Sequence, residues 1–115
     1  MAKVLLLDNQ AHMLELLRSK FEVEGFEVLT AESGGAGVQL AQSERPDLIV
    51  LDERLLDEEG VPVAERLKQL DELSDIPVIL LTTRTAENGD SREGAASVQL
   101  PFRPSQLLAL VRENL

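Results

Sequence analysis

LIVLD, at residues 48–52, is one of three short apolar runs in this 115-residue chain that end in a single oxygen-bearing side chain. The other two are VLLLD at residues 4–8 and VILLT at residues 78–82. Apolar runs of this length without alternation are typical of strands buried on both faces, as in a parallel sheet covered by helices. Because the carboxyl ends of such strands share one edge, we expect the two carboxylates and the hydroxyl to converge where open α/β sheets bind ligands.

Between these runs, the sequence predicts helices that alternate with strands. Ser33 and Pro46 are suited to cap and to stop one of the helices, and apolar residues recur at helical spacing in the others. This alternation favours a doubly wound α/β fold, in which helices cover both faces of a parallel sheet. The other helices are expected over residues 10–24, 61–70 and 104–115, and the additional strands over residues 26–30 and 98–100.

Two segments depart from this regular pattern. The stretch from Thr82 to Gly94 has almost no large apolar residue to hold a helix against a sheet, so we expect a loop or a frayed helix there. The glycines at positions 34, 35 and 37 weaken the predicted second helix. They are also weak evidence for a phosphate cradle, because no Lys-Ser or Lys-Thr pair follows them.

Composition excludes several classes of function. The chain has no cysteine and one histidine, which excludes disulfides and thiolate nucleophiles and argues against zinc chemistry. A net charge of −10 argues against contact with the phosphates of nucleic acid. No apolar run approaches the ~20 residues of a membrane span, and no signal-peptide pattern opens the chain. We therefore expect a soluble, cytoplasmic domain with no membrane contact.

Asp8 and Asp52 are the residues most suited to chemistry. Two carboxylates at neighbouring strand ends repel each other unless a cation lies between them, and Mg²⁺ is often held by one or two carboxylates together with a phosphate. A carboxylate beside bound magnesium can also act as a nucleophile toward a phosphoryl group, which gives an acyl phosphate. The Thr82 hydroxyl could then hydrogen-bond a phosphoryl oxygen.

With these residues in place, the whole chain resembles the receiver domain of two-component response regulators, a family with a CheY-like fold. The resemblance implies a flavodoxin-like sheet of five parallel strands, and residues 1–115 are expected to form a single receiver-like domain. The spacing from Asp52 to Gly60 also matches the family. The matching motifs are KVLLLDNQ at residues 3–10, DLIVLD at 47–52, IPVILLT at 76–82, and Gly94-Ala95 with Pro101-Phe102.

By this resemblance, Asp52 is the phosphoacceptor and Thr82 the switch hydroxyl that contacts the phosphoryl group. Asp8, Asn9, Asp52 and the backbone carbonyl of Arg54 would provide the magnesium site. The phosphoryl group would come from a histidine kinase or a phosphotransfer protein. The result would be read by a downstream protein partner or a fused output domain, and homodimer formation is left open.

The chain departs from the family at two positions in the site. Asn9 stands where a second acid is usual, so the affinity for magnesium is expected to fall. Leu100, directly before Pro101-Phe102, stands where the family has a lysine that pairs with the phosphoryl group, and a leucine cannot neutralise phosphoryl charge. The arginines that could take over this role are Arg54, Arg84 and Arg103.

Two hypotheses of function stay open at this point. The first is a switch controlled by phosphorylation of Asp52. The second is a degenerate pseudo-receiver, a protein–protein interaction module that works without phosphorylation, and it draws on the Asn9 and Leu100 replacements and on the absence of an aromatic at Ser97 or Val98. An enzyme is disfavoured, because aspartate-based phosphohydrolases need an acid where this chain has Arg54. A flavin binder is disfavoured by the loop after the first strand.

Overall fold

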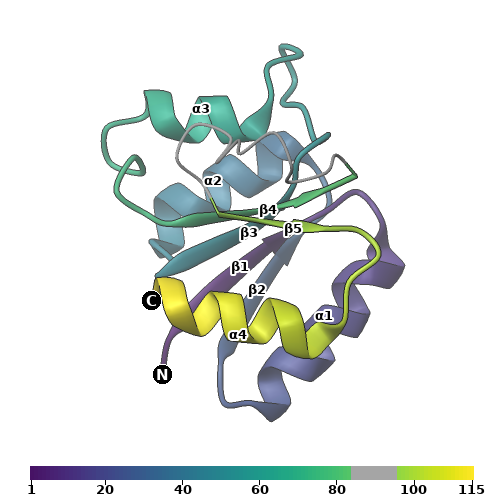
Figure 1. The fold of residues 1–115 in the computed structure, drawn as a ribbon. Helices are drawn as coiled ribbons and strands as arrows, with labels where there is room; N and C mark the ends of the chain where they lie inside the picture. The colour runs from purple at the N-terminus through teal and green to yellow at the C-terminus, as the bar shows by residue number, and fades with distance from the viewer. Residues whose placement is uncertain (84–95) are drawn as a thin grey trace.

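The computed structural model describes residues 1–83 and 96–115, and it places five parallel strands in one sheet of order β2-β1-β3-β4-β5 (Figure 1). This arrangement confirms the predicted flavodoxin-like, doubly wound α/β fold. In chain order the elements are β1 (Lys3–Leu7), α1 (Ala11–Val23), β2 (Glu27–Ala31), α2 (Gly34–Glu44), β3 (Leu48–Asp52), α3 (Val63–Gln69), β4 (Val78–Thr82), β5 (Ala96–Gln99) and α4 (Pro104–Asn114).

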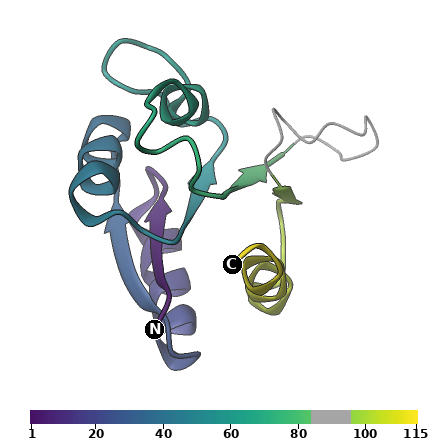
Figure 2. The same ribbon diagram turned by 90° about the vertical axis from the view of Figure 1, so that its left-hand side faces the viewer.

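The sheet separates two hydrophobic layers. Alternate residues of each strand point to opposite faces, so Val4 and Leu6 of β1 pack in one layer while Leu5 and Leu7 pack in the other. Helices α1 and α4 cover the first face, and α2 and α3 cover the second (Figure 2). The unbroken apolar runs of the sequence are explained by this burial on both faces.

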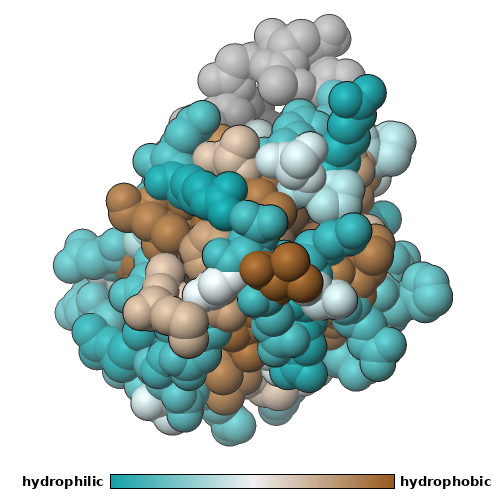
Figure 3. Space-filling view, turned by 90° about the horizontal axis from the view of Figure 1, so that it is seen from below, coloured by the Kyte–Doolittle hydropathy of each residue, from teal (hydrophilic) through white to brown (hydrophobic). Residues whose placement is uncertain are grey.

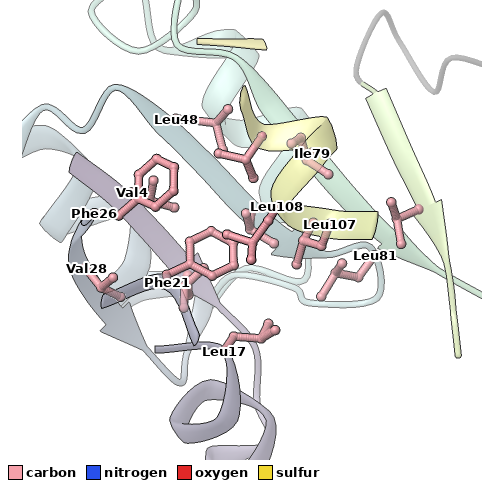
Figure 4. Packing of buried hydrophobic residues seen from close by; sticks show 14 of the residues in the cluster. Val4, Leu17, Phe21, Phe26, Val28, Leu48, Ile79, Leu81, Leu107 and Leu108 are labelled. Atoms are coloured by element: carbon pink, nitrogen blue, oxygen red, sulfur yellow. The ribbon is translucent and has the colours of Figure 1, made fainter. Parts of the chain in front are cut away.

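The layer beneath α1 and α4 contains Phe21, the largest fully buried side chain among the described residues (Figure 4). Its ring lies 5.5 Å from that of Phe26, centroid to centroid, in a tilted arrangement. Leu107 and Leu108 of α4 pack in the same layer. Full burial of an aliphatic or aromatic side chain of this size stabilises a fold by about 1.5–3 kcal/mol.

Helix α2 begins as the sequence predicts. The Ser33 hydroxyl accepts a hydrogen bond from the backbone N–H of Ala36 at 3.2 Å and caps the helix. The glycines of its first turns serve packing. A Cβ on Gly34 would lie 2.4 Å from the carbonyl oxygen of Leu56, and one on Gly37 would lie 2.2 Å from a methyl of Leu7. These glycines therefore let α2 lie directly against β1 and the loop that follows β3.

Residues 84–95 lie outside the described part of the chain, so the expected loop or frayed helix between β4 and β5 stays a prediction. Across the described residues, no helix is both long and apolar enough to cross a membrane. On the face that carries α1 and α4, hydrophobic residues are interspersed among hydrophilic ones (Figure 3).

Candidate functional site

Three polar side chains gather at the carboxyl edge of the sheet. Asp8 directly follows β1, Asp52 is the last residue of β3, and Thr82 is the last residue of β4. The strands β1, β3 and β4 are neighbours in parallel register, which brings these ends together. Among the described residues, these are the only buried polar or charged ones, each with 3% of its surface exposed. Burial of two carboxylates at one edge is costly without compensation, and the surrounding contacts show how it is met.

The backbone holds both carboxylates in the same way. Oδ1 of Asp8 accepts a hydrogen bond from the backbone N–H of Gln10 at 2.9 Å, and Oδ1 of Asp52 accepts one from that of Arg54 at 2.8 Å. Each is the local turn that an aspartate forms with the N–H two residues later. The chain therefore turns sharply after β1 and β3 and keeps both carboxylates at the edge.

The Arg54 side chain also returns to Asp52. Its Nε donates to Oδ1 at 3.2 Å and its Nη2 donates to Oδ2 at 3.0 Å, so the guanidinium spans both carboxylate oxygens. The hydrogen bond to Asp52 raises the pKa of Arg54 above its ordinary value. The Asp52 side chain is only 4% exposed, whereas that of Arg54 is 59% exposed. A buried carboxylate is thus paired with a cation that reaches it from the solvent side.

Asp8 is in a different electrostatic position. Burial raises the pKa of the Asp8 carboxyl above its usual range, and the charge of Asp52 acts in the same direction. The backbone N–H of Gln10 and the guanidinium of Arg54 oppose this rise. The charge of Arg54 therefore acts on both carboxylates of the site, although it hydrogen-bonds only Asp52.

Thr82 is engaged by the residue that follows Asp52. Its hydroxyl donates a short hydrogen bond to Oε1 of Glu53, whose backbone N–H in turn donates to the carbonyl of Leu81 at 2.9 Å. Glu53 is half-buried. The site hydroxyl is therefore held by the carboxylate of the residue directly after β3, rather than lying open at the edge.

The end of β5 contributes an apolar side chain. The backbone N–H of Leu100 donates to the carbonyl of Thr82 at 2.7 Å, which places Leu100 beside the site. Its side chain packs against the hydrophobic layer beneath α1 and α4. Of the three arginines that could take over the role of the missing lysine, two are described, and Arg54 is the one of these two that contacts Asp52. Arg103 is the N-cap residue of α4, and Arg84 lies outside the described residues.

The loop between β3 and α3 is fixed by its own polar contacts. Asp57 accepts hydrogen bonds from the backbone N–H groups of Glu59 and Val61 at 2.8 and 3.0 Å. Nε of Arg66 donates to the second oxygen of the same carboxylate at 2.8 Å. The Arg66 guanidinium, followed by these N–H groups, lowers the pKa of Asp57. The loop that carries Arg54 is consequently anchored on α3.

The sequence matches a known protein family. Residues 4–112 match the family model of the response regulator receiver domain. The chain belongs to the response regulator receiver family. PilH of Pseudomonas aeruginosa is 36% identical to this receiver domain over 98 residues, which make up 83% of the chain and 81% of PilH. Several transcriptional regulators that the chain also matches are longer, and it spans about half the length of each.

Solved structures agree with the fold of this receiver domain. The chemotaxis response regulator CheY4 of Vibrio cholerae superposes with a TM-score of 0.87 at 25% identity, over 100% of this chain and 99% of that one. The receiver domain of the sensor histidine kinase PA1611 from P. aeruginosa superposes with a TM-score of 0.80 at 18% identity, over 98% of this chain and 96% of that one. That structure has a magnesium ion coordinated in its active-site cleft.

The oxygen atoms at the edge of the sheet in this receiver domain are of the type that magnesium binds. Asp8 and Asp52 offer buried carboxylate oxygens, and the Arg54 carbonyl stands at the turn after β3. Magnesium takes oxygen ligands and needs only one or two carboxylates from the protein. Asn9 is exposed and adds no charge. No group of three or more acidic or histidine side chains that could hold a metal occurs in the described residues.

Sequence reasoning missed two contacts of this receiver domain. It assigned the backbone carbonyl of Arg54 to the metal and named its side chain only as one of three substitutes for the lysine. It gave Glu53 no role. A usable signal was present, because Arg54 follows Asp52 at the same distance at which Gln10 follows Asp8, and both turns bring the later residue back to the carboxylate.

Proposed function

We propose that this receiver domain accepts a phosphoryl group on Asp52 from a histidine kinase or a phosphotransfer protein. The observation that supports the proposal best is the burial of the Asp52 carboxylate at the end of the central strand, with Asp8 and Thr82 at the ends of the neighbouring strands. A buried carboxylate held by a backbone N–H keeps one fixed orientation toward an incoming phosphorus.

In the proposed reaction, an oxygen lone pair of Asp52 forms the new O–P bond. The P–N bond of the phosphohistidine breaks at the same time, and its electron pair stays on the imidazole nitrogen of the donor. Atoms and charge are conserved, and the product is an acyl phosphate on Asp52. Thr82 lies on the strand beside Asp52 and would donate its hydroxyl to a phosphoryl oxygen after leaving Glu53.

Asp8, Asp52 and the Arg54 carbonyl would hold the magnesium ion, with Asn9 as a weaker, neutral donor. When bound, magnesium neutralises charge on the transferred group. The residues of the chain place Asp52 and limit its freedom. Because one acid of the usual pair is absent and Arg54 already pairs with Asp52, we expect the affinity for magnesium to be reduced.

The signal would reach a downstream protein partner or a fused output domain. The chain spans only about half of several transcriptional regulators that it matches, so both arrangements fit the proposal. With its net charge of −10, the domain itself would not contact nucleic acid. We place the whole exchange in the cytoplasm.

The proposal is tested by incubation of the protein with phosphoramidate and Mg²⁺, followed by intact-protein mass spectrometry. Wild type should gain the mass of one phosphoryl group, and Asp52→Asn should gain none. The Asp57→Asn variant is a matched control, because it removes one carboxylate from the adjoining loop and leaves Asp52 in place. Wild type that stays unmodified at high donor concentration would rule out the proposal.

A second candidate function is a pseudo-receiver that acts as an interaction module without phosphorylation. Two observations favour it: Leu100 brings no charge to the site, and the Thr82 hydroxyl is already bound by Glu53. The two functions differ in their response to a phosphoryl analogue. Beryllofluoride with Mg²⁺ should change amide hydrogen exchange at the ends of β3 and β4 in a switch, and should change nothing in a pseudo-receiver.

Restoration of the family residues tests the reason for the reduced magnesium affinity. Asn9→Asp adds the missing acid, and Leu100→Lys adds the missing cation. We expect Asn9→Asp to bind Mg²⁺ about tenfold more tightly, since a second carboxylate is a strong magnesium ligand. Titration of both variants with Mg²⁺ by calorimetry measures the effect, and equal affinity in Asn9→Asp and wild type would contradict it.

A further inference from the structure

The side chain of Arg54 bridges both oxygens of the Asp52 carboxylate, at 3.2 Å from Nε to Oδ1 and 3.0 Å from Nη2 to Oδ2. On this geometry, and resting on the proposed phosphorylation of Asp52, we propose that Arg54 supplies the cation that binds the phosphoryl group. The acceptor and its cation then come from the same turn after β3, and the last strand takes no part.

The charge at the site requires such a cation. Asp52 carries about −1 before transfer and about −2 as an acyl phosphate near neutral pH, as a phosphorylated side chain does. Asp8 is buried beside it, and Glu53 adds a third acidic side chain. The field of Arg54 reaches both Asp8 and Asp52. Without this guanidinium, the added charge would stand beside the buried carboxylate of Asp8 with one cation fewer to balance it.

The position of the guanidinium also suits a phosphoryl group on Asp52. Asp52 is 4% exposed and Arg54 is 59% exposed, so the cation lies on the solvent side of the carboxylate, from which a phosphodonor must arrive. A phosphoryl group on Asp52 would extend outward into the space next to the guanidinium. The planar fork of arginine matches two oxygens of a phosphoryl group as well as it matches a carboxylate.

The end of β5 offers no competing cation. The side chain of Leu100 packs into the hydrophobic layer beneath α1 and α4, and its backbone N–H is committed to the carbonyl of Thr82. A lysine at position 100 would have to cross from β5, past β4, to reach Asp52. Arg54 reaches the same carboxylate from two residues away, which keeps the ordering of its side chain local.

The same contact between Arg54 and Asp52 could instead hinder phosphorylation, and an experiment can distinguish the two roles. A guanidinium that neutralises Asp52 also weakens it as a nucleophile, and in that case Arg54 would act as a brake on phosphorylation. The two roles predict opposite changes in the rate of phosphoryl transfer when the guanidinium is removed. Loss of the cation slows phosphoryl transfer if Arg54 binds the phosphoryl group, and accelerates it if Arg54 is a brake.

The test measures the initial rate of phosphorylation by phosphoramidate with Mg²⁺, by intact mass, in wild type, Arg54→Gln and Arg54→Lys. In this reaction the Asp52 oxygen forms the O–P bond, the P–N bond breaks, and the nitrogen leaves with the electron pair as ammonia. We expect phosphorylation of Arg54→Gln to be at least about tenfold slower than that of wild type. The effect should be smaller than the rate loss of about 10²–10³ seen when a fully enclosed donor is removed, because the Arg54 side chain is exposed to solvent and to salt. Arg54→Lys should retain more of the rate, since it keeps the charge.

Arg112→Gln is the matched control. Arg112, in α4, is 52% exposed and forms a surface ion pair at 2.7 Å with Glu24, the C-cap residue of α1. Its replacement by glutamine changes the net charge of the protein by the same amount as Arg54→Gln. Its rate should equal that of wild type. A rate for Arg54→Gln that matches Arg112→Gln, or exceeds wild type, would overturn the inference while leaving phosphorylation of Asp52 intact. Absence of phosphorylation in wild type would overturn both.

A second variant separates charge from loop shape. Leu100→Lys in the Arg54→Gln background adds a cation from β5, and its aliphatic stem can stay against the layer that Leu100 now packs on. We expect this double variant to be at least about threefold faster than Arg54→Gln alone, with folding checked by circular dichroism. If neither Arg54→Lys nor the double variant exceeds Arg54→Gln, Arg54 acts only by shaping the turn, and the inference is wrong.

Discussion

The ends of β3 and β5 lie at the same edge of one sheet and contribute opposite things to it. The end of β3 provides Asp52, and the turn after it returns both the backbone N–H and the guanidinium of Arg54 to that carboxylate. The end of β5 leads into Leu100, whose partly buried side chain packs against the hydrophobic layer beneath α1 and α4. In the proposed role of Arg54, the turn after β3 supplies the cation that the residue after β5 lacks.

Burial follows the same division. All five residues of β3 are buried, and both hydrophobic layers draw on them. In β5, at the edge of the sheet, only Val98 is buried. A central strand fixes its last residue through many contacts, and an edge strand fixes its own through few. Asp52, the proposed phosphoacceptor, thus ends a strand that is buried along its whole length, whereas Leu100 follows a strand with one buried residue.

The strongest test of this contrast compares the same substitution in the two strands. Val50→Ala and Val98→Ala remove the same atoms from the same hydrophobic layer. We expect Val50→Ala to lower the free energy of unfolding by about 2–3 kcal/mol, from lost burial and the cavity left behind, and Val98→Ala to lower it by less because an edge strand can relax. Urea denaturation measures both, and equal losses would break the comparison between the strands.

The second test concerns the loop that follows β3. A Cβ on Gly34 would meet the carbonyl of Leu56, which is backbone and cannot turn away, so Gly34→Ala should cost about 1–3 kcal/mol. A Cβ on Gly35 would meet only the end of the flexible Glu58 side chain. Gly35→Ala is the matched control and should be neutral or stabilising by up to about 1 kcal/mol, since alanine favours a helix. Thermal unfolding of the pair decides, and similar midpoints would contradict the packing role of Gly34.

The smallest predicted effect is the pH dependence of the same loop. Arg66 lowers the pKa of Asp57 in the folded state, so the stability from this carboxylate is complete above the unfolded pKa of about 3.9 and is lost as pH falls through the lower, folded value. The difference in Tm between wild type and Asp57→Asn should shrink as pH is lowered from about 5 to about 3. Glu24→Gln, which removes an exposed pair with Arg112, should change Tm little. A constant difference for Asp57→Asn across this range would exclude the linkage.

Much of the fold could be read from the sequence, for a physical reason. Strands buried on both faces are continuous apolar runs, and the predicted ends at Asp52 and Thr82 are the last residues of β3 and β4. Ser33 caps its helix as expected, because capping depends on a few adjacent residues. The sequence also placed the polar residues at one edge, since parallel strands share a direction.

The remaining features depend on contacts that spacing alone does not determine. The glycines at the start of α2 read as helix breakers, yet Gly34 is required by a loop 22 positions further along the chain. The pairing of Thr82 with Glu53 needs the register of β3 and β4, and so does the place of Leu100 beside Thr82.

The approach of Gly34 to Leu56 has a mechanical consequence. Because no side chain lies between them, the backbone at the start of α2 is in direct contact with the loop after β3. A displacement of the loop toward the helix must therefore move the helix as well. The loop begins at the acceptor turn and is tied to α3 by Asp57 and Arg66. A movement that starts at Asp52 is therefore transmitted through this loop to α2 and α3, which lie on the opposite face of the sheet from α1 and α4.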